Sequence, residues 1–242
     1  MSWPALLTRL FRPSSGSAPP GLDPRCDRVL IDVNIHAAQL LGHAVALRDH
    51  GTVTHNMRVA WMSSRLGEAL GLDRTAMQAL MKGAFLHDVG KIGIPDAILL
   101  KPGELTPEER IIMNRHPELG AELIRDIAWF SDAAPVVRHH HERYDGTGYP
   151  QALRGVAIPL AARIFAVVDV FDALISERPY KSAMPGGQAL AFMAPKAGSH
   201  FDPAVLEVFL PLAPKLHDAM GDQEVETLKP LLESQRRRYF GI

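Results

Sequence analysis

The chain is poor in cysteine, in surplus charge and in long apolar runs. Cys26 is the single cysteine among 242 residues, so no internal disulfide can form and a reducing compartment is expected. The 26 basic and 27 acidic residues give a net charge of −1, which provides no general attraction to nucleic acid or to an anionic membrane. No apolar run reaches the roughly 18 residues that suggest a membrane span, and residues 1–11 lack the length and cleavage site of a secretory signal. We therefore expect a cytoplasmic protein without a membrane span, whose anionic ligands are bound by a local cluster of cations.

Alternating apolar and polar residues, the pattern of β-strands, are also almost absent. Apolar residues instead recur at steps of three and four, which predicts helices over about 29–47, 53–70 and 74–89. With 47% hydrophobic residues the chain can bury a sizeable core, which excludes a disordered regulator. Residues 12–24 are mostly proline, serine and glycine. The sequence thus predicts a flexible leader over 1–28, an all-α domain over 29–215 that includes an N-terminal packing helix, and a helical tail over 216–242.

Helix start signals organise the second half of the chain. Thr106 and Glu109 form a capping box around a first-turn proline, and this helix should stop near His116. Pro117, Pro135, Pro159 and Pro203 each suit the opening of another helix. A glycine- and proline-rich loop over 145–159 interrupts them, and 222–240 is predicted to form one more helix with arginines 236–238 at a solvated end. The tryptophans 61 and 129 and the methionine-rich stretch 77–81 are expected in the core.

The histidines and aspartates that can ligate a metal lie near helix ends. The adjacent pair His87-Asp88 follows an apolar helix and runs into Gly90-Lys91. Neighbouring helical residues point about 100° apart, so the pair suits two ions better than one, with the carboxylate as a bridge. Ligation by histidine and aspartate without thiolate favours Fe, Mn, Ni or Zn.

Four long motifs resemble the HD-GYP family, a branch of the HD-superfamily metal-dependent phosphohydrolases. They are H-D-V-G-K-I-G-I-P-D from His87, K-P-G-E-L-T from Lys101, H-H-E-R-Y-D-G-T-G-Y-P from His140 and R-P-Y-K from Arg178. The resemblance covers about residues 51–212, including G-S-H-F-D-P from Gly198. It implies an HD-domain helical bundle with a long GYP loop.

The resemblance also implies an activity and a site. The family hydrolyses the bacterial second messenger cyclic di-GMP to linear pGpG or to GMP. Its phosphate-facing lysine corresponds to Lys91, which joins Asp88 as a catalytic residue. Its other substrate-side residues correspond to Arg178, Lys181, the loop residue Tyr149 and Asp172, the last as a supporting residue one turn after a ligand. Carried over residue by residue, the metal ligands fall on His55, His87, Asp88, His116, His140, His141 and Asp169, while His139 is left for a surface or supporting role.

The chemistry of such a site is metal-assisted hydrolysis. Two metals would share a bound water and lower its pKa, which would supply a hydroxide nucleophile near neutral pH. Some HD-GYP proteins bind a third metal through an acidic residue four positions before the first histidine, but this chain has Gly51 there. Asp49 and His50 are less suitable substitutes, because they lie off that helix face. We expect two metals, Fe or Mn before Ni or Zn, and the linear dinucleotide as main product.

The loop motif leaves two interpretations open. Gly146 and Gly148 permit positive φ, and Tyr149 and Pro150 offer rigid apolar surface. This is either a tight turn, held by ion pairs of residues 142, 143 and 145, or a loop that shapes the substrate mouth or docks a partner such as a diguanylate cyclase. A homodimer is a further candidate assembly.

Two other functions compete with cyclic di-GMP hydrolysis. One is an HD hydrolase acting on another cyclic dinucleotide. The other is a non-catalytic cyclic di-GMP sensor or adaptor. Loss of metal ligands would favour the sensor, and every ligand position of the family is filled here.

Overall fold

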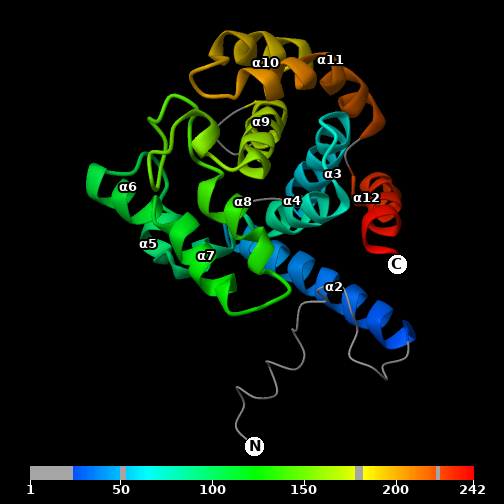
Figure 1. Cartoon of the computed structure of the whole chain (residues 1–242). Coiled ribbons are helices and arrows are strands. Elements are labelled where there is room, and N and C mark those ends of the chain that lie inside the picture. Colours follow the sequence, from blue (N-terminus) through cyan, green and yellow to red (C-terminus); the bar gives the residue numbers. More distant parts are fainter. Residues whose placement is uncertain (1–23, 50–52, 178–181, 222–223) are drawn as a thin grey trace, which may run out of the picture.

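The computed structural model describes residues 24–49, 53–177, 182–221 and 224–242, and these contain helices and no strand (Figure 1). The predicted all-α fold is confirmed. The α-helices are α2 (Pro24–Arg48), α3 (Val53–Ala69), α4 (Arg74–Leu86), α5 (Asp96–Leu99), α6 (Pro107–Met113), α7 (His116–Arg125), α8 (Ala134–His139), α9 (Leu160–Ile175), α10 (Gly186–Met193), α11 (Pro203–Ala219) and α12 (Val225–Phe240). Short 3₁₀ turns lie between them, of which η1 (Val89–Gly93) matters most for the site.

The helix ends follow the local signals of the sequence. The Thr106 capping box is present at α6, and α7 begins at His116 with a proline in its first turn. Asp202 caps α11 by accepting a hydrogen bond from the amide of Ala204. α4 ends at Leu86, earlier than predicted, and the chain tightens into η1. α2 begins at Pro24, so the end of the expected leader is helical, while residues 1–23 lie outside the described residues.

The core lies where α3 packs against α4, α9 and α12. Trp61, Met77, Met81 and Trp129 are buried in it, as predicted. α2 packs along α3 and α4 and reaches η1 with its C-terminal end. Burial of this one continuous apolar cluster fixes the relative positions of the helix ends that carry the polar site.

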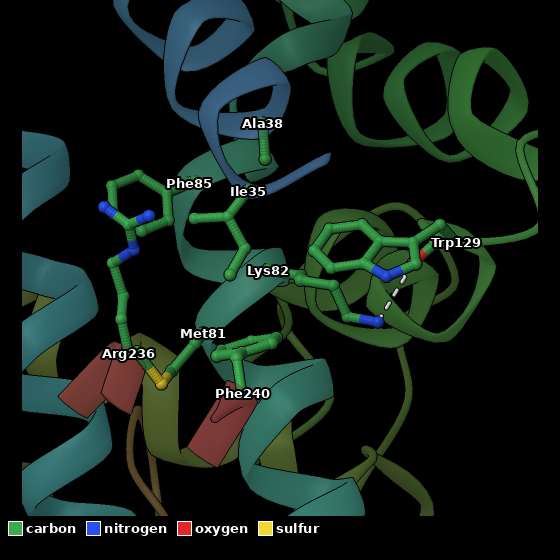
Figure 2. A pocket seen from close by; sticks show the side chains of 8 residues that line it. All are labelled: Ile35, Ala38, Met81, Lys82, Phe85, Trp129, Arg236 and Phe240. Carbon is green, nitrogen blue, oxygen red and sulfur yellow. Dashed lines mark hydrogen bonds between the residues drawn. The ribbon is translucent and has the colours of Figure 1, made fainter. Parts of the chain in front are cut away.

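α12 is part of this domain rather than a separate tail. Its Tyr239 and Phe240 are buried in the core cluster. The prediction of a solvated arginine end is wrong for Arg236, whose side chain is 12% exposed and pairs with Asp32 of α2 at 2.5 Å. Figure 2 shows Arg236 at a small pocket between α2, α4 and α12, lined by Ile35, Ala38, Met81, Lys82, Phe85, Trp129, Arg236 and Phe240.

One helix of the described residues passes a length and composition test for a membrane span. It is the stretch Asp27–Arg48 of α2, whose most apolar window is 33% buried against the rest of the domain. The absence of a membrane span therefore stays a prediction.

Candidate metal centre

The predicted ligands come from five places in the chain and converge at one end of the core. His55 lies in the first turn of α3, His87 and Asp88 follow α4, and His116 opens α7. The remaining three lie at the end of α8 and within α9. Their donor atoms fall into two groups, each within 4.8 Å, namely Asp88, His116, His140 and His141 in the first group, and His55, His87 and Asp169 in the second group.

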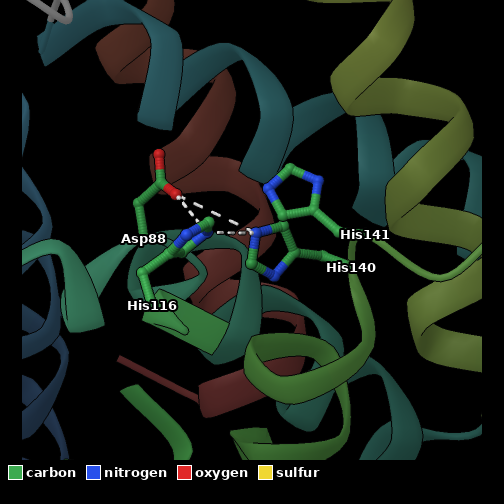
Figure 3. Close-up of side chains that lie close together, drawn as sticks. All are labelled: Asp88, His116, His140 and His141. Atoms are coloured by element: carbon green, nitrogen blue, oxygen red, sulfur yellow. Dashed lines mark hydrogen bonds and ion pairs between the residues drawn. The ribbon is translucent and has the colours of Figure 1, made fainter. Parts of the chain in front are cut away.

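The first group is centred on one oxygen of Asp88 (Figure 3). Asp88 Oδ1 lies 3.3 Å from His116 Nε2 and 3.9 Å from His140 Nε2. The two Nε2 atoms of His116 and His140 are themselves 3.3 Å apart. Three imidazoles and a carboxylate thus surround one point.

The other oxygen of Asp88 faces the second group. Asp88 Oδ2 lies 3.2 Å from His87 Nε2, and Asp169 Oδ1 lies 3.6 Å from His55 Nε2. The adjacent residues His87 and Asp88 therefore fall in different groups, with Asp88 facing both. A carboxylate whose two oxygens face two donor groups has the geometry of a bridging ligand.

Hydrogen bonds fix the histidine rings so that Nε2 faces inward. Nδ1 of His87, His116 and His140 lies 2.8–2.9 Å from the backbone carbonyl three residues earlier. A carbonyl only accepts, so Nδ1 is the protonated nitrogen and Nε2 keeps a lone pair. The facing Nε2 atoms of His116 and His140 are then two acceptors, an arrangement that a shared cation stabilises.

Burial favours the neutral form of His140 and His141, whereas neighbouring cations keep the bridging carboxylate of Asp88 charged. Burial, with the neighbouring histidines, lowers the pKa of His140 and His141 well below the usual value. Burial alone would raise the pKa of Asp88, but Lys91 and His87 lower it well below its usual value. Neutral imidazoles around an ionised carboxylate form a ligand set that metal ions bind.

Gly90 and Gly120 allow η1 and α7 to approach each other closely. A Cβ on Gly90 would lie 1.9 Å from the carbonyl oxygen of His116 and 2.4 Å from the amide of Gly120. Any side chain at Gly90 would push α7 away from η1. The close contact brings His116 beside Asp88.

Asp172 acts behind His55 rather than at the substrate. Its side chain is fully buried and lies 2.8 Å from His55 Nδ1. It also accepts 2.5 and 2.9 Å hydrogen bonds from the guanidinium of Arg58, which lower its pKa against the effect of burial. This corrects the expected substrate contact, because a fully buried carboxylate offers no surface to a ligand. The supporting role fits, since a carboxylate behind a histidine ligand orients its ring.

Lys91 lies beside the bridging carboxylate. Its Nζ is 2.8 Å from Asp88 Oδ2 and 2.5 Å from Asp49 Oδ2. Burial opposes the charge, but the two carboxylates raise the pKa of Lys91 above its ordinary value, so it is a cation. Asp49, weighed from the sequence as a substitute metal ligand, is instead paired with this lysine. Gly51 and His50 lie outside the described residues.

The loop after α8 is held mainly by hydrogen bonds to its backbone. The buried Glu142 accepts from the amides of Gln151 and Leu153 at 2.8 and 3.1 Å. Gly146 has a positive φ of 81°, as expected, whereas the φ of Gly148 is not positive. Gly148 is needed for a different reason, because a Cβ there would lie 2.3 Å from the amide of residue 143.

The other predicted loop contacts are only partly ionic. Arg143 lies 3.8 Å from Asp145, and both bind Thr147 by hydrogen bonds. Tyr149 packs its ring against His141, with centroids 4.7 Å apart. The loop motif is therefore a structured turn that presents Tyr149 at the metal centre.

Three predicted residues remain, namely His139, Arg178 and Lys181. His139 is buried, not on the surface, with Nδ1 3.8 Å from Glu142 Oε1. Arg178 and Lys181 lie outside the described residues, so their substrate contacts remain predictions.

Sequence reasoning missed Arg58 and Arg48. Arg58 is 4% exposed within an otherwise apolar stretch of α3, one turn after His55. A lone arginine at a core position was the available signal, because a buried guanidinium requires a carboxylate partner. Arg48 had no such signal, since it ends a helix where a cation is ordinary.

Comparison with known proteins places this arrangement in a family. The HD domain family model matches residues 39–205. The chain is 42% identical over 192 residues to the cyclic di-GMP phosphodiesterase response regulator RpfG of Xanthomonas campestris, covering 78% of this chain and 51% of the relative. It is 39% identical over 197 residues to a cyclic di-GMP phosphodiesterase of Thermotoga maritima, covering 81% and 54%. The chain thus spans about half the length of these two relatives.

Solved structures share the fold. A cyclic GMP-AMP specific phosphodiesterase of Vibrio cholerae superposes with a TM-score of 0.59 at 21% identity, over 81% of this chain and 53% of that chain. An HDGYP protein from Bdellovibrio bacteriovorus gives 0.57 at 17% identity, over 87% and 78%. The matched family model, the relatives and the motifs together show that the chain belongs to the HD domain family, as a member of its HD-GYP branch.

Proposed function

We propose that this chain is a metal-dependent phosphodiesterase that hydrolyses cyclic di-GMP to linear pGpG and, more slowly, to GMP. The observation that carries the proposal is the position of Asp88, whose two oxygens face two groups of donors. Relatives at about 40% identity that are named cyclic di-GMP phosphodiesterases support the substrate.

The donor set fits two metal ions. Seven residues supply imidazole and carboxylate groups without a thiolate, and two Nε2 lone pairs face each other at 3.3 Å. This chemistry suits Fe or Mn, with Ni or Zn as alternatives, and leaves positions for water or substrate. Bound together, two such ions supply Lewis acidity and a hydroxide near neutral pH.

The chain's own residues position and neutralise the substrate. Lys91 is a cation beside Asp88 and can approach a non-bridging phosphate oxygen there. The ring of Tyr149, packed on His141, forms one wall of the centre. Arg178 and Lys181 are proposed to bind the second phosphate, Arg178 through two parallel hydrogen bonds.

Hydrolysis of another cyclic dinucleotide is the second candidate. It is favoured by a relative 39% identical over 172 residues that is named a 3'3'-cGAMP-specific phosphodiesterase. A non-catalytic sensor is less well supported, because all seven donors converge in two groups.

The wider setting is also a proposal. We place the enzyme in the cytoplasm, with 29–215 as its catalytic region and residues 216–242 packed onto that region through α12. The loop around Tyr149 is proposed to dock a diguanylate cyclase or another signalling protein, and a homodimer is a candidate assembly.

Product identification with metal analysis tests the activity. Protein purified without oxygen should contain close to two ions per chain and convert cyclic di-GMP to pGpG faster than it converts 3'3'-cGAMP. The Asp88→Ala variant serves as the inactive control. Faster turnover of 3'3'-cGAMP would favour the second candidate, and tight cyclic di-GMP binding without turnover in fully loaded protein would favour the sensor.

A further inference from the structure

The C-terminal end of α2 contacts Lys91 at two points through two consecutive residues. Arg48 Nη1 donates to the backbone carbonyl of Lys91 at 2.7 Å. Asp49 Oδ2 lies 2.5 Å from the Lys91 ammonium. One residue therefore holds the backbone of Lys91 and the next holds its charged end.

Arg48 fixes more than one point of the turn that carries Lys91. Its Nη2 donates to the carbonyl of Ile94 at 2.7 Å, just beyond η1, and to Asp96 at 2.6 Å. A guanidinium is planar and rigid, so donating to two carbonyls sets the distance between them. On the other side of η1, Gly90 is packed against α7. The backbone of the turn is thus held between α2 and α7.

The ion pair of Asp49 with Lys91 is not an ordinary surface pair. The side chains are only 25% and 17% exposed, whereas surface pairs are weak because water screens them. In addition, the other partner of Lys91 is Asp88, whose oxygens face the two donor groups. When Asp88 ligates metal, Asp49 remains to hold the ammonium in place.

We infer that Arg48 and Asp49 are positioning residues for Lys91, with Arg48 fixing its backbone and Asp49 its ammonium beside the metal centre. The inference rests on the proposed function for its effect on turnover, in which Lys91 meets a substrate phosphate. Neither residue touches the substrate itself.

Asp49→Asn tests this assignment because it keeps the shape and removes the charge. Its kcat for cyclic di-GMP should fall by at least about 10-fold, because a displaced catalytic group can cost roughly 100-fold, while metal content and melting temperature stay at the wild-type values. Asp49→Glu should recover part of the loss. Asp32→Asn is the matched control, since Asp32 also lies on α2 and pairs with a cation, Arg236, remote from the centre.

A second readout does not depend on activity. The Lys91 ammonium, assigned by its loss in Lys91→Arg, should give a protected ¹H–¹⁵N signal in the wild type and in Asp32→Asn. This signal should be lost in Asp49→Asn. Wild-type turnover in Asp49→Asn, or a retained ammonium signal, would overturn the inference. If the wild type hydrolyses no cyclic dinucleotide, the proposed function fails, and loss of the ammonium signal in Asp49→Asn still establishes the positioning.

Discussion

The metal centre and the loop over 142–155 are both polar structures within an apolar helical domain, yet their polar groups are used differently. In the loop, polar side chains bind the chain itself, as Glu142 does with two backbone amides. In the centre, Nδ1 of three histidines binds the backbone while Nε2 faces other acceptors.

The polar groups of the loop therefore serve folding, whereas those of the centre serve ligand binding. Burying a polar group without a partner costs free energy, so folding alone would not favour acceptors that face one another. The loop gains its stability from satisfied hydrogen bonds, whereas the centre is completed by cations. Substitutions in the centre should therefore change metal binding and turnover, and substitutions in the loop should change stability.

The largest effect is expected from Asp88→Ala. It removes the carboxylate whose two oxygens face both groups, so metal should be lost from both. Turnover should fall by more than the roughly 100-fold that outer-shell changes cost. Metal analysis and product chromatography check this, with circular dichroism as a control for folding. Wild-type turnover in a metal-depleted sample would contradict it.

Asp172→Asn should affect the second group alone. It weakens the hydrogen bond that orients His55 and removes the charge that Arg58 pairs with. The metal affinity of the second group should fall by roughly 10- to 100-fold, measured by titration of metal-free protein. The control is Asp132→Asn, which removes the charge paired with Lys82 away from the centre. Equal loss of affinity at both sites would contradict the division into two groups.

Glu142→Gln should act on stability instead. An amide side chain offers one acceptor oxygen where the carboxylate serves two backbone amides, so the free energy of unfolding should fall by about 1–3 kcal/mol. Metal content should stay unchanged. Urea unfolding of the variant can be compared with Glu122→Gln, an exposed position where the change should stay within about 0.5 kcal/mol. Loss of metal at unchanged stability would contradict the proposal that the loop stabilises the fold while the centre binds metal.

The smallest effect is a pH dependence near the loop. Burial lowers the pKa of His200 from 6.5 to about 4, and the cations Arg143 and Lys196 add to this shift. The carboxylate of Asp145 opposes it. Between these values the unfolded chain binds a proton that the folded chain does not, so stability present above pH 6.5 is lost as the pH falls to about 4. His200→Gln should flatten this part of the stability curve, and His36→Gln, at an exposed side chain, should not. Identical curves for wild type and His200→Gln would contradict the assignment.

Local signals explain how much of the fold was predictable. The Thr106 capping box and the prolines mark helix starts because they act within one turn, and the structure has those helices. The turn at His87-Asp88 was predictable for the same reason. The ends of α2 and α4 were less so, because packing decides whether a final turn continues.

Long-range contacts explain what was not predictable. Arg58 and Asp172 are 114 residues apart, and Lys91 and Asp49 lie on different elements. No periodicity in the sequence relates such pairs. Gly148 shows the same limit, since its need for glycine comes from the neighbouring backbone and not from its own φ.

The scattering of the donors along the chain has a consequence for how the protein matures. His55 and Asp169 come from α3 and α9, so the second group exists only after the chain between them has closed. The unfolded chain therefore has no comparable site, and cations bind the native state preferentially. Loading then stabilises the native state by mass action, which makes heat resistance rise with metal concentration and makes metal content a measure of the correctly folded fraction.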